Sequence, residues 1–254
     1  MNSQKLESYL SLSTQFYDLI RPEPPKDAYL FYRSYVCEAD RHILEPMCGS
    51  GRFLLPLIQE GFDVNGFDAS EYMLKALRDK AAARDLKPTI WHDYVGHLDG
   101  KNKYNLIFIP SGSFGHIIEF EEIKKSLENF YENLHENGIL LFEAESSLSA
   151  PMSQLGIWRG MVCNKPDGNS ILISRLSNIQ DNVCYSIDKY ELLENDKVVQ
   201  TEIEKFNVRL YDDRTILLKI LQDIGFRDIK IVKAHDRSSQ SDENDAAFVY
   251  ECRK

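Results

Sequence analysis

Residues 44–52 read LEPMCGSGR, in which a short apolar run leads into two closely spaced glycines, Gly49 and Gly51. The pattern predicts a strand over residues 42–46, a turn at the glycines and a helix over residues 53–59. Glycine in such a turn lets the backbone approach a ligand closely, and the start of the helix offers amide groups that lack helical partners. The stretch therefore predicts a ligand site where a strand passes into a helix.

Acidic residues follow the next two predicted strands. Asp68 ends a strand over residues 62–67, and Asp93 follows one over residues 89–91. Because ligands of open α/β sheets bind at the carboxyl ends of the strands, we expect these carboxylates and Glu45 to face one crevice. At that place Asp68 can accept hydrogen bonds from both hydroxyls of a ribose, and Asp93 could meet an adenine amine.

Other interpretations of the two glycines are weaker. They could form only a tight turn between a strand and a helix. The turn lacks the full dinucleotide fingerprint, which argues against an NAD site, and the chain lacks the Walker pattern of ATP-binding loops.

The rest of the chain alternates between strand and helix patterns, apart from one block. Further strands are predicted at residues 105–109, 139–142, 229–232 and 247–251, and helices at 70–84, 121–136 and 213–224. The block between them has alternating segments separated by turn sequences, which is typical of antiparallel strands. The predicted fold is α/β: a Rossmann-like, seven-stranded, mostly parallel sheet with helices on both faces and an antiparallel β insertion.

The same pattern predicts the domain organisation. Residues 1–150 and 211–254 would form the ligand-binding domain, and residues 151–210 would form the β insertion. The acidic, serine-rich residues 238–245 are expected to form a solvated loop.

The composition and net charge argue against several classes of function. The 254 residues carry a formal net charge of −10, and so acidic a surface disfavours nucleic acid, whose affinity depends on cations that neutralise phosphates. No apolar run is long enough to span a membrane, and the first residues lack the apolar core of a signal peptide. The five cysteines form no CxxC pair, so we expect reduced thiols, no metal site and a cytoplasmic location.

Residues 45–51 resemble motif I of the class I methyltransferases that depend on S-adenosylmethionine (SAM), Asp/Glu-x-Gly-x-Gly-x-Gly. Glu45, Gly49 and Gly51 match the motif, and Met47 stands where the family has its first glycine. The resemblance implies that SAM is the cofactor, with Glu45 near its amino group and Asp68 at its ribose. It covers about residues 17–144, with a weaker match at residues 218–232.

The resemblance extends to the adenine end of the site. Residues 69–74 resemble the helix start that packs on the adenine, and Met73 is the expected contact. Asp93 matches the acidic residue after the third strand, and Tyr94 lies next to it. We therefore expect Met73, Asp93 and Tyr94 to bind the cofactor.

Two further segments resemble small-molecule N-methyltransferases, including those that act on amino sugars. Residues 113–116 resemble their Ser-x-Gly-His loop, which makes His116 the candidate base, although it could equally be a capping or packing histidine. The pair Tyr17-Asp18 resembles the Tyr-Asp on their N-terminal helix, where the tyrosine can face donor or acceptor; Tyr17 could also be an ordinary core residue.

The insertion stands where members of this family carry a substrate cap or a dimer surface, so a homodimer is possible. Five residues in or just after it are candidates to line the acceptor pocket: Trp158, Arg159, Tyr185, Tyr190 and Arg214. The two arginines would suit an acidic group on the substrate.

Together these patterns predict a SAM-dependent methyltransferase that acts on N or O of a small molecule. A SAM-binding protein without catalysis, or a protein methyltransferase, are the alternatives. An RNA methyltransferase is disfavoured by the net charge and by the missing Asn/Asp-Pro-Pro-Tyr loop after residues 105–109.

Overall fold

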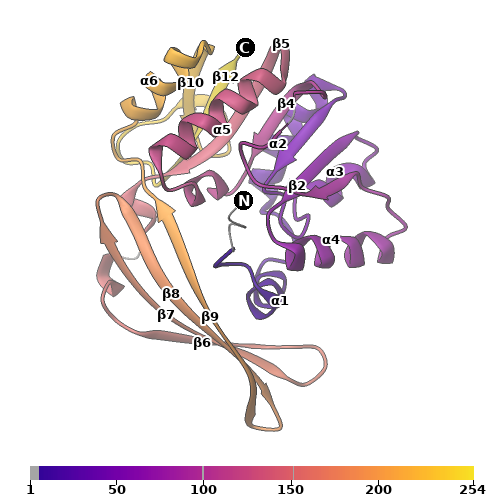
Figure 1. The fold of residues 1–254 in the computed structure, drawn as a ribbon, viewed down its shortest axis with the longest axis vertical. Coiled ribbons are helices and arrows are strands. Elements are labelled where there is room, and N and C mark those ends of the chain that lie inside the picture. Colours follow the sequence, from indigo (N-terminus) through magenta and orange to yellow (C-terminus); the bar gives the residue numbers. More distant parts are fainter. Residues whose placement is uncertain (1–5, 99, 151) are drawn as a thin grey trace.

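The computed structural model describes residues 6–98, 100–150 and 152–254. In these residues the chain forms one eight-stranded sheet flanked by helices and a separate four-stranded sheet (Figure 1). The smaller sheet extends away from the larger one, with helix α1 (Ser11–Ile20) beside it.

The large sheet has the strand order β11-β10-β12-β5-β4-β1-β2-β3. Strands β3, β2, β1, β4 and β5 run parallel, whereas β12 runs antiparallel to both of its neighbours, β5 and β10. The bounds are β1 Ile43–Pro46, β2 Val64–Asp68, β3 Ile90–His92, β4 Tyr104–Ile109, β5 Leu134–Glu145, β10 Arg227–Lys233, β11 Asp236–Gln240 and β12 Ala247–Arg253. The predicted α/β class with a mostly parallel sheet is confirmed.

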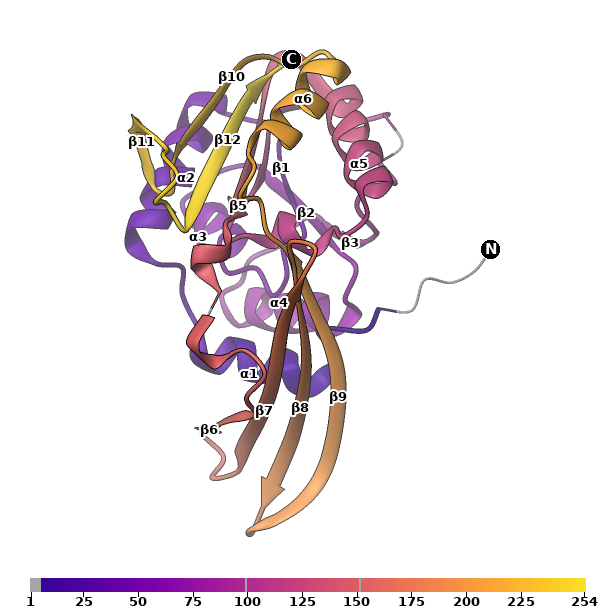
Figure 2. The same cartoon turned by 90° about the vertical axis from the view of Figure 1, so that its left-hand side faces the viewer.

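Helices cover both faces of this sheet (Figure 2). One buried cluster joins the strands to α2 (Lys26–Ala39), α3 (Leu54–Gln59) and α4 (Glu71–Ala83). The other cluster joins them to α5 (Phe120–Asn133) and α6 (Thr215–Ile224). Neighbouring residues of one strand, such as Ile43 and Leu44, belong to opposite clusters, because successive side chains of a strand point to opposite faces.

Two predicted boundaries are wrong. The helix expected over residues 121–136 ends at Asn133, because Leu134 turns to extended backbone and pairs with Tyr104 as the start of β5. The loop expected over residues 238–245 is replaced at its start by β11, whose Asp236 and Gln240 pair with the end of β10. This edge strand is the eighth in a sheet for which we predicted seven.

The four-stranded sheet is antiparallel, in the order β6-β7-β8-β9. Its strands are β6 Arg159–Asn164, β7 Ser170–Gln180, β8 Val183–Glu194 and β9 Lys197–Arg209. Leu12 and Phe16 of α1 pack on Ile171, Ile173 and Tyr190 in a small core of their own. Helix α1 therefore docks on this sheet, and the division of the chain at residues 150 and 211 stays a prediction.

Within the described ranges, none of the helices is both long and apolar enough to cross a membrane.

Candidate active site

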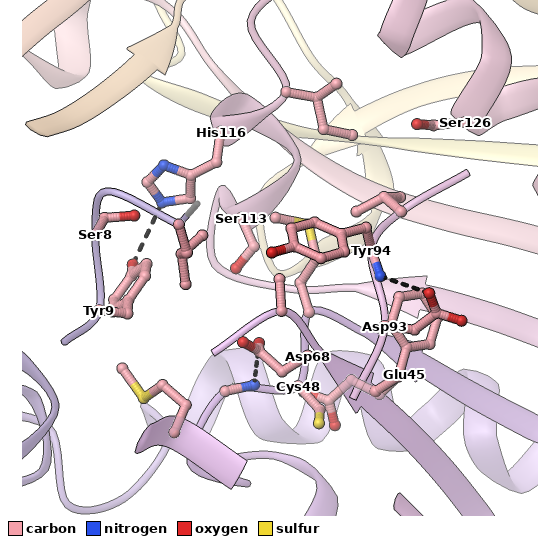
Figure 3. Close-up of a pocket in the computed structure, with 18 of the residues that line it drawn as sticks. Ser8, Tyr9, Glu45, Cys48, Asp68, Asp93, Tyr94, Ser113, His116 and Ser126 are labelled. Atoms are coloured by element: carbon pink, nitrogen blue, oxygen red, sulfur yellow. Dashed lines mark hydrogen bonds between the residues drawn. The ribbon is translucent and has the colours of Figure 1, made fainter. Parts of the chain in front are cut away.

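A cavity of about 440 Å³ lies at the carboxyl ends of β1, β2, β3 and β4 (Figure 3). Residues 6–9 of the N-terminal segment and Lys205 and Asn207 of β9 complete its wall. Its volume falls in the range of small-molecule sites. Eight of the nine residues that we predicted for the site line it: Tyr17, Glu45, Gly49, Asp68, Met73, Asp93, Tyr94 and His116.

The backbone of the glycine turn fixes Asp68. Gly49, with a φ of +54°, donates its N–H to Asp68 Oδ2 at 2.8 Å, and the N–H of Ser70 donates to Oδ1 at 2.8 Å. Burial raises the pKa of Asp68, while these two hydrogen bonds act in the opposite direction. Each carboxylate oxygen keeps a further lone pair, so the arrangement can accept hydrogen bonds from a ribose.

Gly51 lies in the packed core of the turn, away from the cavity wall. It is not among the described residues that line the cavity, and a Cβ atom there would lie 2.8 Å from Leu77 Cγ and 2.9 Å from Leu55 Cγ. Its φ of +81° also favours glycine. Gly51 therefore serves the close packing of α3 and α4 around the turn, and its predicted cofactor contact gains no support from the cavity wall.

Met47 stands where the family motif has a glycine, and its φ is +56°. The turn thus keeps the left-handed backbone that a glycine adopts freely, at a cost of about 1–2 kcal/mol for a side-chain-bearing residue. Met47 offsets part of this cost by packing against the core and lining the cavity.

Two buried polar groups of opposite charge lie on the cavity wall without full partners. Glu45 is 2% exposed, and its Oε2 has no hydrogen-bond partner among the described residues. Arg52 donates from Nη2 to Ser111 Oγ at 2.6 Å, but its buried Nε has no such partner. Buried polar atoms normally have partners, so the pair is poised to receive a ligand with an ammonium and a carboxylate group.

Arg52 was missed in the sequence analysis. Its signal is its place directly after the second glycine, in the turn that leads into α3. Desolvation raises the pKa of Glu45, and the opposing charge of Arg52 lowers it. A cationic ligand group beside Glu45 would act in the same direction as Arg52.

The three residues predicted to contact the adenine all line the cavity. Met73 is buried at the first turn of α4, whose cap is Ser70, since the Met73 N–H donates to Ser70 Oγ at 3.2 Å. Asp93 Oδ1 accepts from the N–H of Tyr94 at 2.8 Å. Figure 3 shows Asp93 and Tyr94 side by side on the cavity wall, and the roles of these residues and of Met73 stay predictions.

The protonation of His116 follows from its partners. Its Nδ1 lies 3.0 Å from the backbone oxygen of Asn207, which can only accept, so Nδ1 carries the proton. Its Nε2 lies 3.3 Å from the hydroxyl of Tyr9 and accepts from it. Burial lowers the pKa of His116, which favours the neutral ring. The geometry thus offers a neutral imidazole with its basic nitrogen toward the cavity.

Tyr9 was also missed. Nothing in its local sequence signals the site, because its hydrogen bonds to Glu204, His116 and Ser70 join residues more than 60 positions apart. Its ring meets Tyr17 edge-on at 6.3 Å between centroids, and Arg52 lies 5.5 Å from the centre of the Tyr17 ring. The two tyrosines therefore form one aromatic wall, and the role of Tyr17 toward the substrate stays a prediction.

The candidates from the insertion do not reach this site. Trp158 and Tyr185 are exposed, and Tyr190 is buried against α1. Arg159 donates a hydrogen bond to Gln154, and Arg214 donates one to Ser241. None of the five is among the described residues that line the cavity, so this expectation was wrong. The insertion contributes through β9, which runs past the cavity.

In the described part of the chain, no group of three or more His, Cys, Asp or Glu side chains is placed to hold a metal ion. The five cysteines are free thiols.

The family model for a methyltransferase domain matches residues 43–138. A Geobacillus sp. (strain WCH70) protein that carries the name of a methyltransferase is 30% identical over 52% of this chain and 56% of its own. A glycine/sarcosine N-methyltransferase from Aphanothece halophytica is 27% identical over 41% of this chain and 40% of its own. The chain thus spans about half the length of these curated relatives.

Solved structures match over nearly the whole chain. A SAM-dependent methyltransferase from Clostridium acetobutylicum ATCC 824 has a TM-score of 0.77 at 18% identity, covering 94% of this chain and 96% of its own. The sugar N-methyltransferase KedS8 from Streptoalloteichus sp. ATCC 53650 has a TM-score of 0.75 at 17% identity, covering 100% and 98%. At such identities the likeness shows the fold. The family model shows a methyltransferase domain over residues 43–138 of this chain.

Proposed function

We propose that this chain transfers a methyl group from SAM to N or O of a small molecule. The observation that carries the proposal is the pair Glu45 Oε2 and Arg52 Nε, two buried atoms that have no hydrogen-bond partner among the described residues and lie in the same cavity as Asp68. SAM carries an amino acid end and a ribose, and these residues match the two groups in charge and hydrogen bonding.

When bound, SAM supplies an already activated methyl group, so the chain needs to provide binding, orientation and a dry site. Glu45 and Arg52 would hold the amino acid end, Asp68 the ribose, and Met73, Asp93 and Tyr94 the adenine. The wall formed by Tyr9, Tyr17 and Asn207 would exclude water. His116 would accept a proton from the acceptor at Nε2 once the hydroxyl of Tyr9 moves aside.

A small acceptor is favoured by the enclosure of the site. The N-terminal segment and β9 both border the cavity, which leaves little room for a polymer. The relatives named above include glycine/sarcosine and sugar N-methyltransferases, which supports an amine as the first class of acceptor to test. The absence of a nucleic acid partner, the cytoplasmic location and the possible homodimer stay predictions.

Calorimetry with SAM and with its demethylated product, S-adenosylhomocysteine (SAH), tests the cofactor. Mass spectrometry then follows methyl transfer to a panel of small amines and alcohols that includes glycine, sarcosine and amino sugars. We expect binding of both cofactor forms and transfer to an amine. No binding at millimolar concentration would refute the proposal. Binding without transfer to any small molecule would favour a SAM-binding protein or a protein methyltransferase.

The ionisation of His116 can be measured without knowing the acceptor. Free histidine titrates near pH 6.5, and burial lowers the pKa of His116, so its NMR signal should titrate below that pH. The folded state then binds fewer protons than the unfolded one, so the free energy of unfolding falls as the pH drops from 6.5 to the folded pKa. His116→Asn identifies the signal. A midpoint above 6.5 would contradict the neutral base.

A further inference from the structure

Glu204, on the inner face of β9, is a buried carboxylate that is only 2% exposed. It pairs with no cation in the described part of the chain, although burying an unpaired charge is costly. In the strand register Glu204 lies opposite Asp188, and like charges in such a pair destabilise a sheet. Asp188 already forms an ion pair with Arg175. The sheet alone therefore gives no reason for a glutamate here.

The partners of Glu204 all belong to the N-terminal segment, residues 9–13. Its Oε2 accepts from the N–H of Tyr9 at 2.9 Å, and its Oε1 accepts from the N–H of Leu10 at 3.0 Å. Ser13 Oγ also donates to Oε1, at 2.6 Å. These donors lie 191–195 positions away in the sequence. The carboxylate thus takes up amide donors at the start of α1, which has no cap side chain of its own.

The residue that Glu204 holds is Tyr9, whose φ of +55° is unfavourable for a tyrosine. On the other side, the Tyr9 carbonyl accepts from Ser70 Oγ at 2.6 Å, and Ser70 is bonded to Asp68. The Tyr9 ring contacts His116 and borders the cavity (Figure 3). Tyr9 is therefore clamped between the small sheet and the loop at the ribose end.

We propose that Glu204 is a positioning residue for the cofactor site: it holds Tyr9 as the cover of the ribose end and so slows the release of the cofactor. This inference rests on the proposed function. The rest of α1 has its own anchor, because Asp18 accepts from Ser50 Oγ at 2.5 Å and pairs with Lys80 at 2.9 Å. Loss of the Glu204 contacts should thus free the cover while the helix stays docked.

The test compares Glu204→Gln with the native chain by SAH calorimetry and by stopped-flow release of SAH. The amide keeps the size of the side chain but offers one acceptor oxygen, so one backbone N–H faces another donor. We expect about tenfold weaker SAH binding, carried by faster release at an unchanged association rate. Hydrogen exchange at the amides of Tyr9 and Leu10 should speed up as well.

Glu191→Gln is the matched control, since Glu191 lies on the same sheet in an ion pair with Lys189. If Glu204→Gln fails to fold, Ser13→Ala decides, because it removes one donor and should shift SAH release in the same direction by a smaller factor. Native chain that does not bind SAH refutes the proposed function itself. If the native chain binds SAH but Glu204→Gln releases SAH at the native rate, only the role of Glu204 is refuted. Where Glu204→Gln does not fold, an unchanged rate of SAH release in Ser13→Ala refutes the role of Glu204 in the same way.

Discussion

Replacing Asp68 with alanine is expected to weaken SAM binding by about 100-fold, because the two charge-assisted hydrogen bonds that we propose between Asp68 and the ribose would be lost together. The change also leaves the N–H groups of Gly49 and Ser70 without the acceptor that orders the turn. Calorimetry with SAM and SAH measures the effect. Both ligands carry the same ribose, so both affinities should fall by a similar factor.

The control for this change is Asp79→Ala. Asp79 lies on α4 in an exposed ion pair with Lys75, so its loss removes a carboxylate near the site without touching the cavity. It should leave SAM binding within about twofold of the native value. If Asp68→Ala also stayed that close, Asp68 would not bind the ribose and the cofactor assignment would need another anchor.

Gly51→Ala is expected to lower the free energy of unfolding by about 3 kcal/mol, which corresponds to a fall in Tm of roughly 6–12 °C. The new methyl group would overlap Leu77 and Leu55, and alanine would be strained at a φ of +81°. Urea denaturation of the native and altered chains gives the difference.

Gly61→Ala separates the two causes. Gly61 has a φ of +94°, but nothing lies within 4 Å of the position of an added Cβ atom. Its replacement should therefore cost only the backbone strain, about 1–2 kcal/mol. Equal losses at Gly51 and Gly61 would show that α3 and α4 accommodate the methyl group and that packing is not the reason for glycine at residue 51.

The sequence was sufficient for the parallel half of the fold, because its signals are local. A buried strand, a turn with glycines and a capped helix at Ser70 each depend on neighbours within a few residues. The carboxylates at the strand ends followed from the geometry of parallel sheets. Strand β11 escaped prediction because its sequence, DRSSQ, is polar and it is ordered by pairing with the end of β10.

The site was harder to predict where it depends on contacts between distant residues. Tyr9 is held at the cavity by hydrogen bonds to Glu204 and Ser70, and no periodicity connects these three positions. The expectation that insertion side chains such as Tyr185 on β8 would line the pocket failed for the converse reason. Residue type suggested an aromatic wall, but strand register decides which side of a sheet a residue faces.

The docking of α1 on the small sheet has a consequence for biosynthesis. Helix α1 is synthesised before the small sheet, and Glu204 on β9, which binds the segment leading into this helix, follows almost 200 residues later. Strand β12, which fills the gap between β5 and β10, is synthesised after both of them. The cavity therefore cannot close until β9 has emerged from the ribosome, and the amphipathic helix α1 must wait undocked, exposed to chaperones, until then.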